Sequence, residues 1–344
     1  MSVRRYVWIL VVLAFATLAA AQKPAAPPQE QAAPLVLTDA IPLEGIKGRF
    51  DHFSFGHAQV FVSALGSNAV LVINVGARTL EHTITGVPDP QGVAVSPETN
   101  KLFVASGSAG KVFVYDATSF LQVAAVDFPG GADNLRYDAA TKRVYVGCGN
   151  DENTGAIAVI DAVTNQRTAE EYKLGGEPES FQLEKSGPNI YVNVPDLKQV
   201  VVVNRATKAI SHWPLTGVSG NFPMALDEAD RRLFVGTHDP ARLAVLDTAS
   251  GRMVASLPGV QASDDLYYDA ARKRVYMPGA EGFIYVYQMG DPDHYRLHAK
   301  IPTAVGAGTA GYFGRQGKGF DRFFLAVPAH GNEPAEMRIY TAQD

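Results

Sequence analysis

From residue 35 onward, short apolar runs alternate with polar turns, and one apolar motif recurs seven times along the chain. Each copy is an apolar triplet with a central aromatic residue, preceded by a basic or polar residue. The copies are Val60-Phe61-Val62, Leu102-Phe103-Val104, Val144-Tyr145-Val146, Ile190-Tyr191-Val192, Leu233-Phe234-Val235, Val275-Tyr276-Met277 and Phe323-Phe324-Leu325. Their central aromatics are spaced by 42, 42, 46, 43, 42 and 48 residues. Short strands that repeat every 40 residues or so predict a β-propeller with one blade per repeat.

Each triplet has companion segments at similar distances along the chain. A strand of smaller residues precedes it, as at 92–95, and a turn rich in Asp, Asn and Pro separates the two, as at 96–100. A second apolar run follows and ends in a polar residue; these runs are 70–74, 112–116, 157–161, 200–204, 243–247, 284–288 and 337–341. Each unit is therefore predicted as a four-stranded antiparallel blade, with its smallest residues nearest the central axis.

The fourth, outer strands predict how the ring closes. Six repeats contain one, at 80–85, 121–127, 167–174, 210–215, 253–257 and 295–301. The seventh repeat ends at Asp344 without one, whereas the segment 35–43 (LVLTDAIPL) resembles an outer strand. We expect this N-terminal strand to complete the last blade and remove the open edge. The predicted fold is an all-β, seven-bladed β-propeller over residues 35–344.

The N-terminus has the pattern of a targeting segment. Arg4 and Arg5 precede an apolar run, and Ala19-Ala20-Ala21 supplies the small residues of a cleavage site, which predicts a signal peptide over 1–21. The apolar run 6–21 is shorter than the roughly 20 residues of a spanning helix, so a retained anchor is the less favoured alternative. Residues 22–34 are predicted as a disordered Pro/Ala-rich linker. We expect a periplasmic or secreted protein with no membrane attachment after cleavage.

Composition and charge narrow the class of partner. The chain is 47% hydrophobic and 19% charged, as in ordinary globular proteins. Removing 1–21 takes away two Arg and no acid, so the net charge changes from −5 to −7. A field of this sign disfavours nucleic acid as a partner. Cys148 is the single cysteine, and we expect a buried small hydrophobe there rather than a nucleophile.

The repeat resembles that of a known family. The segment 92–119, GVAVSPETNKLFVASGSAGKVFVYDATS, is similar to the YVTN-type repeats of exported, YncE-like seven-bladed propellers, and the resemblance covers roughly 35–340. It implies the propeller fold and a binding role. The nucleic-acid binding proposed for some relatives needs a basic surface that this sequence does not have.

The direction of the strands places the candidate site on one face. Loops that precede the inner strands share this face with loops between the second and third strands, and loops at one end of such a scaffold are where function usually lies. The candidate ligand-binding residues are Arg49, Asp51, His52, Gln91, Asp133, Asn134, Glu179, Asn221, Asp264, Asp265, His238, Arg242 and His330.

Four of these carboxylates, Asp51, Asp133, Glu179 and Asp264, are expected to point toward one volume at the channel mouth. Carboxylates confined together require a cation, a proton or an Arg. Oxygen ligands without Cys suit Ca²⁺ or Mg²⁺, whereas the alternative is that each carboxylate caps a strand start. His52 next to Asp51 is either a general base or a buried structural residue.

The function favoured by the sequence is binding. No G-x-S-x-G, H-E-x-x-H, P-loop or Cys-His zinc pattern is present. We therefore expect a non-enzymatic scaffold that binds a small polar ligand, a cation or a partner protein at the loop face. The alternatives are a metal-dependent, lactonase-like hydrolase, in which a bound divalent cation would activate water, and a structural assembly module. The tight-turn carboxylates Glu98, Asp138, Glu184, Asp227, Glu228 and Asp269 are interpreted as turn formers only.

Overall fold

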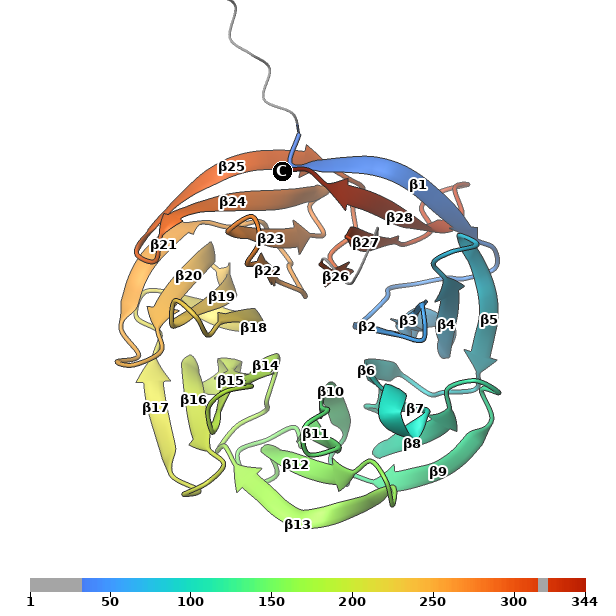
Figure 1. The fold of residues 1–344 in the computed structure, drawn as a ribbon, viewed down its shortest axis with the longest axis horizontal. Coiled ribbons are helices and arrows are strands. Elements are labelled where there is room, and N and C mark those ends of the chain that lie inside the picture. The colour runs from blue at the N-terminus through green and yellow to red at the C-terminus, as the bar shows by residue number, and fades with distance from the viewer. Residues whose placement is uncertain (1–32, 315–320) are drawn as a thin grey trace, which may run out of the picture. The chain divides into compact units, whose positions relative to one another are not determined.

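The strands are arranged as a closed ring of blades. The computed structural model describes residues 33–314 and 321–344, and these residues form seven four-stranded antiparallel sheets around a central axis (Figure 1). This confirms the predicted fold class. The predicted signal peptide and all but the end of the predicted linker lie outside the described residues. Within the described part of the chain, no helix is long and apolar enough to cross a membrane.

Six blades each use four strands that are consecutive in the chain, running from the axis outward. The first three blades are β2 (Phe53–Gly56), β3 (Gln59–Ala64), β4 (Ala69–Asn74) and β5 (Thr79–Thr85); β6 (Pro90–Ser96), β7 (Lys101–Ser106), β8 (Lys111–Asp116) and β9 (Gln122–Asp127); and β10 (Ala132–Asp138), β11 (Arg143–Cys148), β12 (Ala156–Asp161) and β13 (Gln166–Lys173). The next three are β14 (Phe181–Leu183), β15 (Asn189–Val194), β16 (Gln199–Asn204) and β17 (Ile210–Pro214); β18 (Ser219–Asp227), β19 (Arg232–Asp239), β20 (Ala241–Asp247) and β21 (Met253–Pro258); and β22 (Tyr267–Asp269), β23 (Arg274–Gly279), β24 (Phe283–Asp291) and β25 (His294–Pro302). Short 3₁₀ turns are η1 (Leu65–Ser67), η2 (Pro97–Thr99) and η3 (Pro195–Leu197).

The seventh blade joins the two ends of the described chain. Its strands are β26 (Ala310–Phe313), β27 (Arg322–Val327), β28 (Ala335–Ala342) and, outermost, β1 (Leu35–Leu43). The pairing of β1 with β28 is antiparallel and runs from Leu35 opposite Ala342 to Leu43 opposite Ala335. The predicted closure by the N-terminal strand is confirmed, and β28 has no open edge.

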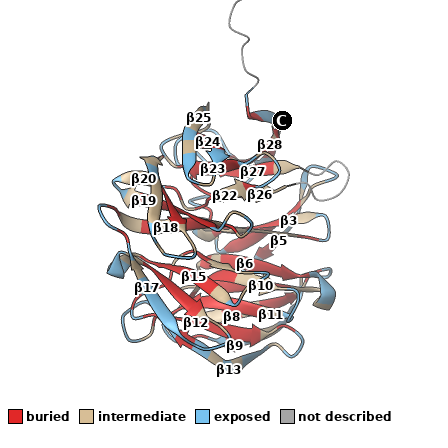
Figure 2. Ribbon diagram, turned by 60° about the vertical axis from the view of Figure 1, so that its left-hand side comes forward, coloured by how far each residue is buried: buried red, intermediate tan, exposed pale blue. Residues whose placement is uncertain are grey.

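The central aromatics of the repeat form the cores between blades. All seven are buried, and each packs on residues of its own blade and of the next one. Phe61, for example, joins Val93 and Val104 of the second blade, and Phe324 of the last blade joins Val62 of the first. The second and third strands of the blades, such as β3 and β4, are the most buried, whereas outer strands such as β17 are exposed (Figure 2). The motif recurs because every blade must bury one large ring against its neighbour.

The polar residues that flank the apolar runs have structural roles. Asp116, at the end of a third strand, accepts backbone N–H bonds from Thr118 and Ser119 at 3.0 and 2.7 Å. Asp161, Asn204 and Asp247 hold the equivalent turns in the same way. Such Asx turns explain why Asp or Asn ends these strands.

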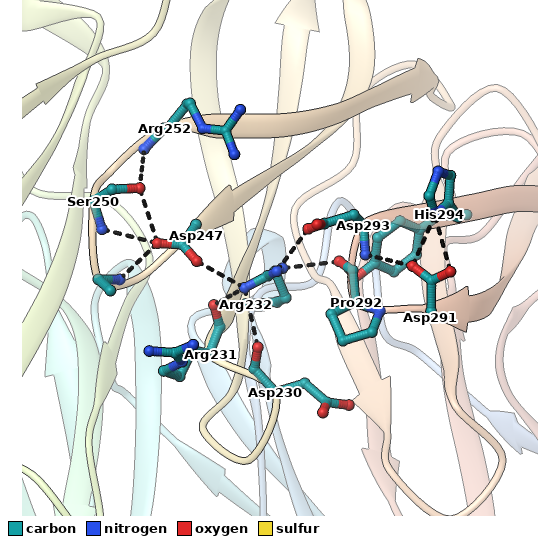
Figure 3. Close-up of polar contacts among 12 residues, drawn as sticks. Asp230, Arg231, Arg232, Asp247, Ser250, Arg252, Asp291, Pro292, Asp293 and His294 are labelled. Carbon is teal, nitrogen blue, oxygen red and sulfur yellow. Dashed lines mark hydrogen bonds and ion pairs between the residues drawn. The ribbon is translucent and has the colours of Figure 1, made fainter.

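The basic residue before the triplet can link neighbouring blades. Arg232 of β19 donates to the Pro292 carbonyl at 2.8 Å and to the Asp293 carboxylate at 2.6 Å, both in the β24–β25 turn of the next blade (Figure 3). Within its own blade it pairs with Asp247 at 2.9 Å. Lys101 reaches the carbonyls of Ala162 and Val163 in the following blade at 2.7 and 2.8 Å.

Candidate functional site

Strand register identifies equivalent positions on the inner strands of the seven blades. Each central aromatic of a second strand lies opposite one inner-strand residue; these are Ser54, Ala94, Arg136, Gln182, Ala225, Tyr267 and Gly311. Three residues earlier in each blade is a second set of equivalent residues, all but the last of which line one cavity: Asp51, Gln91, Asp133, Glu179, Phe222, Asp264 and Gly308. One repeat position therefore places four carboxylates around the axis, at the end of the channel where the inner strands begin.

These carboxylates surround a small cavity, which we call the acidic cavity. It has a volume of about 220 Å³, and its lining is Arg49, Asp51, His52, Gln91, Asp133, Asn134, Glu177, Glu179, Ser180, Phe222 and Asp264. Five of these side chains are carboxylic acids, whereas only Arg49 and His52 can carry positive charge. For scale, a protein cavity of about 150 Å³ holds one benzene molecule. The site is thus of small-molecule size and strongly acidic.

Close packing of the blades fixes the wall of the acidic cavity. Gly92 of β6 takes the position that Asn134 takes in β10, and a Cβ atom there would lie 2.3 Å from the carbonyl oxygen of Asp133. Only glycine allows the two inner strands to approach so closely. The backbone of Asp133 is therefore held against the second blade, and its carboxylate has a defined position.

His52 lies between two carboxylates. Its Nδ1 is 3.2 Å from Oδ1 of Asp265, and its Nε2 is 3.3 Å from Oδ1 of Asp51. Asp265 is itself held by the backbone N–H of Ala310 at 2.9 Å. Burial opposes the charged imidazole, but Asp51 and Asp265 outweigh this effect and raise the pKa of His52 to about 10. His52 is therefore a cation at neutral pH, which argues against a general-base role and favours a structural one.

The acids of this cavity hold protons more tightly than usual. Burial, together with repulsion from Asp133 and Glu177, raises the pKa of Glu179 to about 9. Burial raises the pKa of Asp51 to about 7, although the nearby His52 and Arg49 oppose the rise. The pKa values of Asp133 and Asp264 are also raised, chiefly by burial. Protons thus relieve much of the mutual repulsion.

Five predicted site residues line no part of the acidic cavity, although one of them, Asp265, contacts His52 in its wall. Asn221 is fully buried and donates to the Asn193 side chain and the Gln199 carbonyl at 3.1 and 2.9 Å, so its role is structural. His238 lies behind the wall, where it stacks on Phe222 with ring centroids 4.5 Å apart. The other two are Arg242, on β20, and His330, which is exposed.

A second and larger cavity lies along the channel from the first. We call it the aromatic cavity; its volume is about 640 Å³, and its lining includes six of the seven residues opposite the central aromatics. His52 and Ser180 line both cavities, so the two cavities are adjacent. The aromatic rings that line it belong to Phe53, Phe55, Tyr137, Tyr267, Tyr268, Tyr312 and Phe313.

This second cavity is not predicted from the sequence, although the register of the inner strands contains a signal for it. Arg136, Gln182 and Tyr267 stand opposite aromatics that the repeat does identify. Glu98 also lines the cavity and accepts a hydrogen bond from the Tyr137 hydroxyl at 2.8 Å. Its interpretation as a turn former alone is therefore incomplete.

The candidate metal ligands do not form a coordination site. Among the described residues, no group of three or more His, Cys, Asp or Glu side chains is arranged to hold a metal ion. Asp51, Asp133, Glu179 and Asp264 come from four different blades and border the cavity from different sides. Cys148 lies elsewhere, buried as expected at 6% exposure, and burial raises the pKa of its thiol to about 11.

Comparison with known proteins establishes the fold. No model of a protein family matches the chain, and no curated protein does. A structure of the RRP9 WD40 repeats is similar, with a TM-score of 0.74 and 12% identity over 89% of this chain and 98% of that one. A chain of the mitotic checkpoint complex gives a TM-score of 0.73 and 15% identity over 97% and 99%. A chain of the Kuenenia stuttgartiensis hydrazine synthase gives 0.68 and 14% over 83% and 96%. At these identities the likeness shows a seven-bladed propeller scaffold.

Proposed function

We propose that this chain is an exported, YncE-like binding propeller that holds a small organic cation in the acidic cavity. The observation that carries the proposal is the charge imbalance of the lining, in which five carboxylic acids face one arginine and one histidine around about 220 Å³. A ligand with one or two ammonium groups would replace the protons that now compensate these acids. Phe222 adds an aromatic ring, which attracts cations at distances of about 6 Å or less.

An organic cation suits this cavity better than a bare metal ion or a protein partner. A metal ion needs several ligand atoms that converge on one point, and the described residues contain no such group. For the same reason no observation favours the lactonase-like alternative. A protein partner would need a broad surface, whereas the clustered acids line a small concave volume.

Export is proposed from residues 1–21 alone. Their basic start, apolar run and Ala19-Ala20-Ala21 sequence match a cleavable signal. Expression of the full sequence in a Gram-negative host, followed by fractionation and N-terminal sequencing, tests this. A periplasmic product that begins at Gln22 supports export, and an uncleaved product in the cytoplasm contradicts it.

The binding proposal is tested by calorimetry with matched charged and neutral probes. Putrescine and choline should bind the wild-type chain, whereas 1,4-butanediol, the neutral counterpart of putrescine, should not. The double variant Asp133→Asn, Glu179→Gln should weaken putrescine by at least about tenfold, because each charge-assisted hydrogen bond contributes about 1.5–3 kcal/mol. Asp151→Asn is the control, since Asp151 is an exposed loop residue outside the cavity. Equal binding of butanediol and putrescine, or no binding of either cation, would contradict the proposal.

A further inference from the structure

The aromatic cavity contains a cation that the fold does not pair. Arg136 of β10 donates to the Leu135 carbonyl at 2.8 Å, to the Ser180 hydroxyl at 3.2 Å and to the Asn134 amide oxygen at 3.4 Å. All three acceptors are neutral. Among the described residues no carboxylate lies within 4.0 Å of the Arg136 guanidinium, and Asp265 and Asp133 act on it only from farther away.

The repeat shows that this charge is not needed to build a blade. The six other blades place Ser54, Ala94, Gln182, Ala225, Tyr267 and Gly311 at the equivalent position, and none of these is charged. Burial of a guanidinium is costly, and here it lowers the pKa of Arg136. A single, partly buried Arg among seven equivalent positions therefore indicates a binding role.

The guanidinium is held in a fixed orientation. It lies over the Phe181 ring at 5.4 Å from the centroid, and its hydrogen bonds to Leu135 and Ser180 restrain it further. Those bonds use the two terminal nitrogens and leave N–H groups available to an anion, because a guanidinium has five donors. An arginine that is held in a fixed orientation and has N–H groups available suits a carboxylate, which it can bind through two parallel hydrogen bonds.

The rest of the lining includes seven aromatic rings, together with two acids that already have partners within the protein, Glu98 with Tyr137 and Asp265 with His52. The hydroxyl of Tyr267 donates to the Ala310 carbonyl at 2.6 Å, that of Tyr312 to Asp321 at 3.1 Å, and that of Tyr268 contacts the sulfur of Met289 at 3.4 Å. These hydroxyls are already satisfied within the protein, so the rings contribute stacking surface more than hydrogen bonds. The volume of about 640 Å³ is that of a pocket for a drug-sized ligand.

We infer that the aromatic cavity binds an aromatic carboxylate, whose carboxylate pairs with Arg136 and whose rings pack against Tyr267 and Phe53. Exposed Lys185 at the cavity's edge adds positive charge that attracts an anion. The two cavities would take ligands of opposite charge. This inference does not depend on the proposed function of the acidic cavity.

Calorimetry with 2-naphthoate and its neutral counterpart 2-naphthamide tests the inference. The wild-type chain should bind 2-naphthoate at least about tenfold more tightly than 2-naphthamide, and Arg136→Gln should remove that difference. Arg167→Gln is the matched control, because Arg167 also lies over a phenylalanine ring, Phe128 at 4.8 Å, but on outer strand β13. Equal affinity for the two probes in the wild type, or unchanged naphthoate binding by Arg136→Gln, would overturn the inference.

Two further variants keep the test decisive if Arg136→Gln does not fold. Ala94→Phe fills the cavity and leaves Arg136 in place, so it should weaken both naphthyl probes by about tenfold or more. Unchanged binding by this variant would place the probe elsewhere and overturn the inference. Glu179→Gln alters only the acidic cavity and should leave 2-naphthoate affinity within about twofold, so failure at one cavity is distinguishable from failure at the other. Circular dichroism and thermal melting verify the fold of each variant.

Discussion

At the scale of single residues, the charge of the channel depends on which of its acids and histidines carry a proton. Glu179 and His52 both bind a proton more strongly in the folded chain than in the unfolded one, because their pKa values rise to about 9 and about 10. For each group, the unfolding free energy falls as pH rises between its ordinary pKa and its raised one. The same protons must leave if a cation enters, so putrescine affinity should increase with pH through the range in which Asp51 and Glu179 ionise.

Glu179→Gln should flatten the dependence of stability on pH. Between pH 4.5 and about 9 the wild-type chain loses stability because Glu179 ionises in the unfolded chain but stays protonated in the folded one, whereas glutamine is neutral in both. The melting temperature of the variant should therefore exceed that of the wild type by a margin that grows from pH 5 to pH 9. Differential scanning calorimetry at pH 5, 7 and 9 measures this margin. Glu152→Gln, at an exposed loop position, should give no such trend.

At the scale of elements, contacts between blades are made by residues that precede the repeated triplet. Arg232 is the clearest case, since its side chain is 9% exposed and joins Asp247 of its own blade to Pro292 and Asp293 of the next (Figure 3). The arginine thus takes part in the interface and does not merely start a strand.

Arg232→Met should lower the unfolding free energy by about 1–3 kcal/mol, because partly buried carbonyl and carboxylate groups lose their donor. The half-exposed Asp293 adds little, since solvent screens that pair. Urea denaturation followed by circular dichroism measures the loss. Arg252→Gln, in the same blade but exposed, should change stability by less than about 0.5 kcal/mol, and equal losses for both variants would contradict the role given to Arg232.

The sequence reveals the strands of this protein better than its channel. Phe61 and its six counterparts are large, apolar and regularly spaced, so they identify every blade. Inner strands such as β14 and β22 have only three residues, and their channel-facing positions change from Ala94 to Arg136 to Tyr267. Because these inner-strand positions vary so much in residue type, no sequence pattern identifies them. These residues become visible only through their register against the aromatics.

At the scale of the whole molecule, the site exists only because the ring is closed. Asp51 and Asp264 lie 213 residues apart in the chain but border the same cavity. Five of the predicted rim residues do not line it, because a rim position predicted from chain direction does not determine which way a side chain points; these are Asn221, His238, Arg242, Asp265 and His330.

Closure of the ring depends on the inward-facing side of β1. Leu43 is fully buried in the core shared by the last and first blades, whereas Leu37 on the same strand is 50% exposed. Leu43→Asp would place a charge in this core and release β1, leaving the edge of β28 unpaired and open to aggregation. We expect the melting temperature to fall by about 10 °C or more, or soluble protein to be lost.

Leu37→Asp makes the same substitution at an exposed position of β1 and is the control for Leu43→Asp. It should shift the melting temperature by no more than about 2 °C and leave putrescine and 2-naphthoate binding intact. Thermal melting and size-exclusion chromatography of both variants measure the two outcomes. If Leu43→Asp melted like the wild type, β1 would be dispensable, and the ring would not require the N-terminal strand to hold its first and last blades together around the channel.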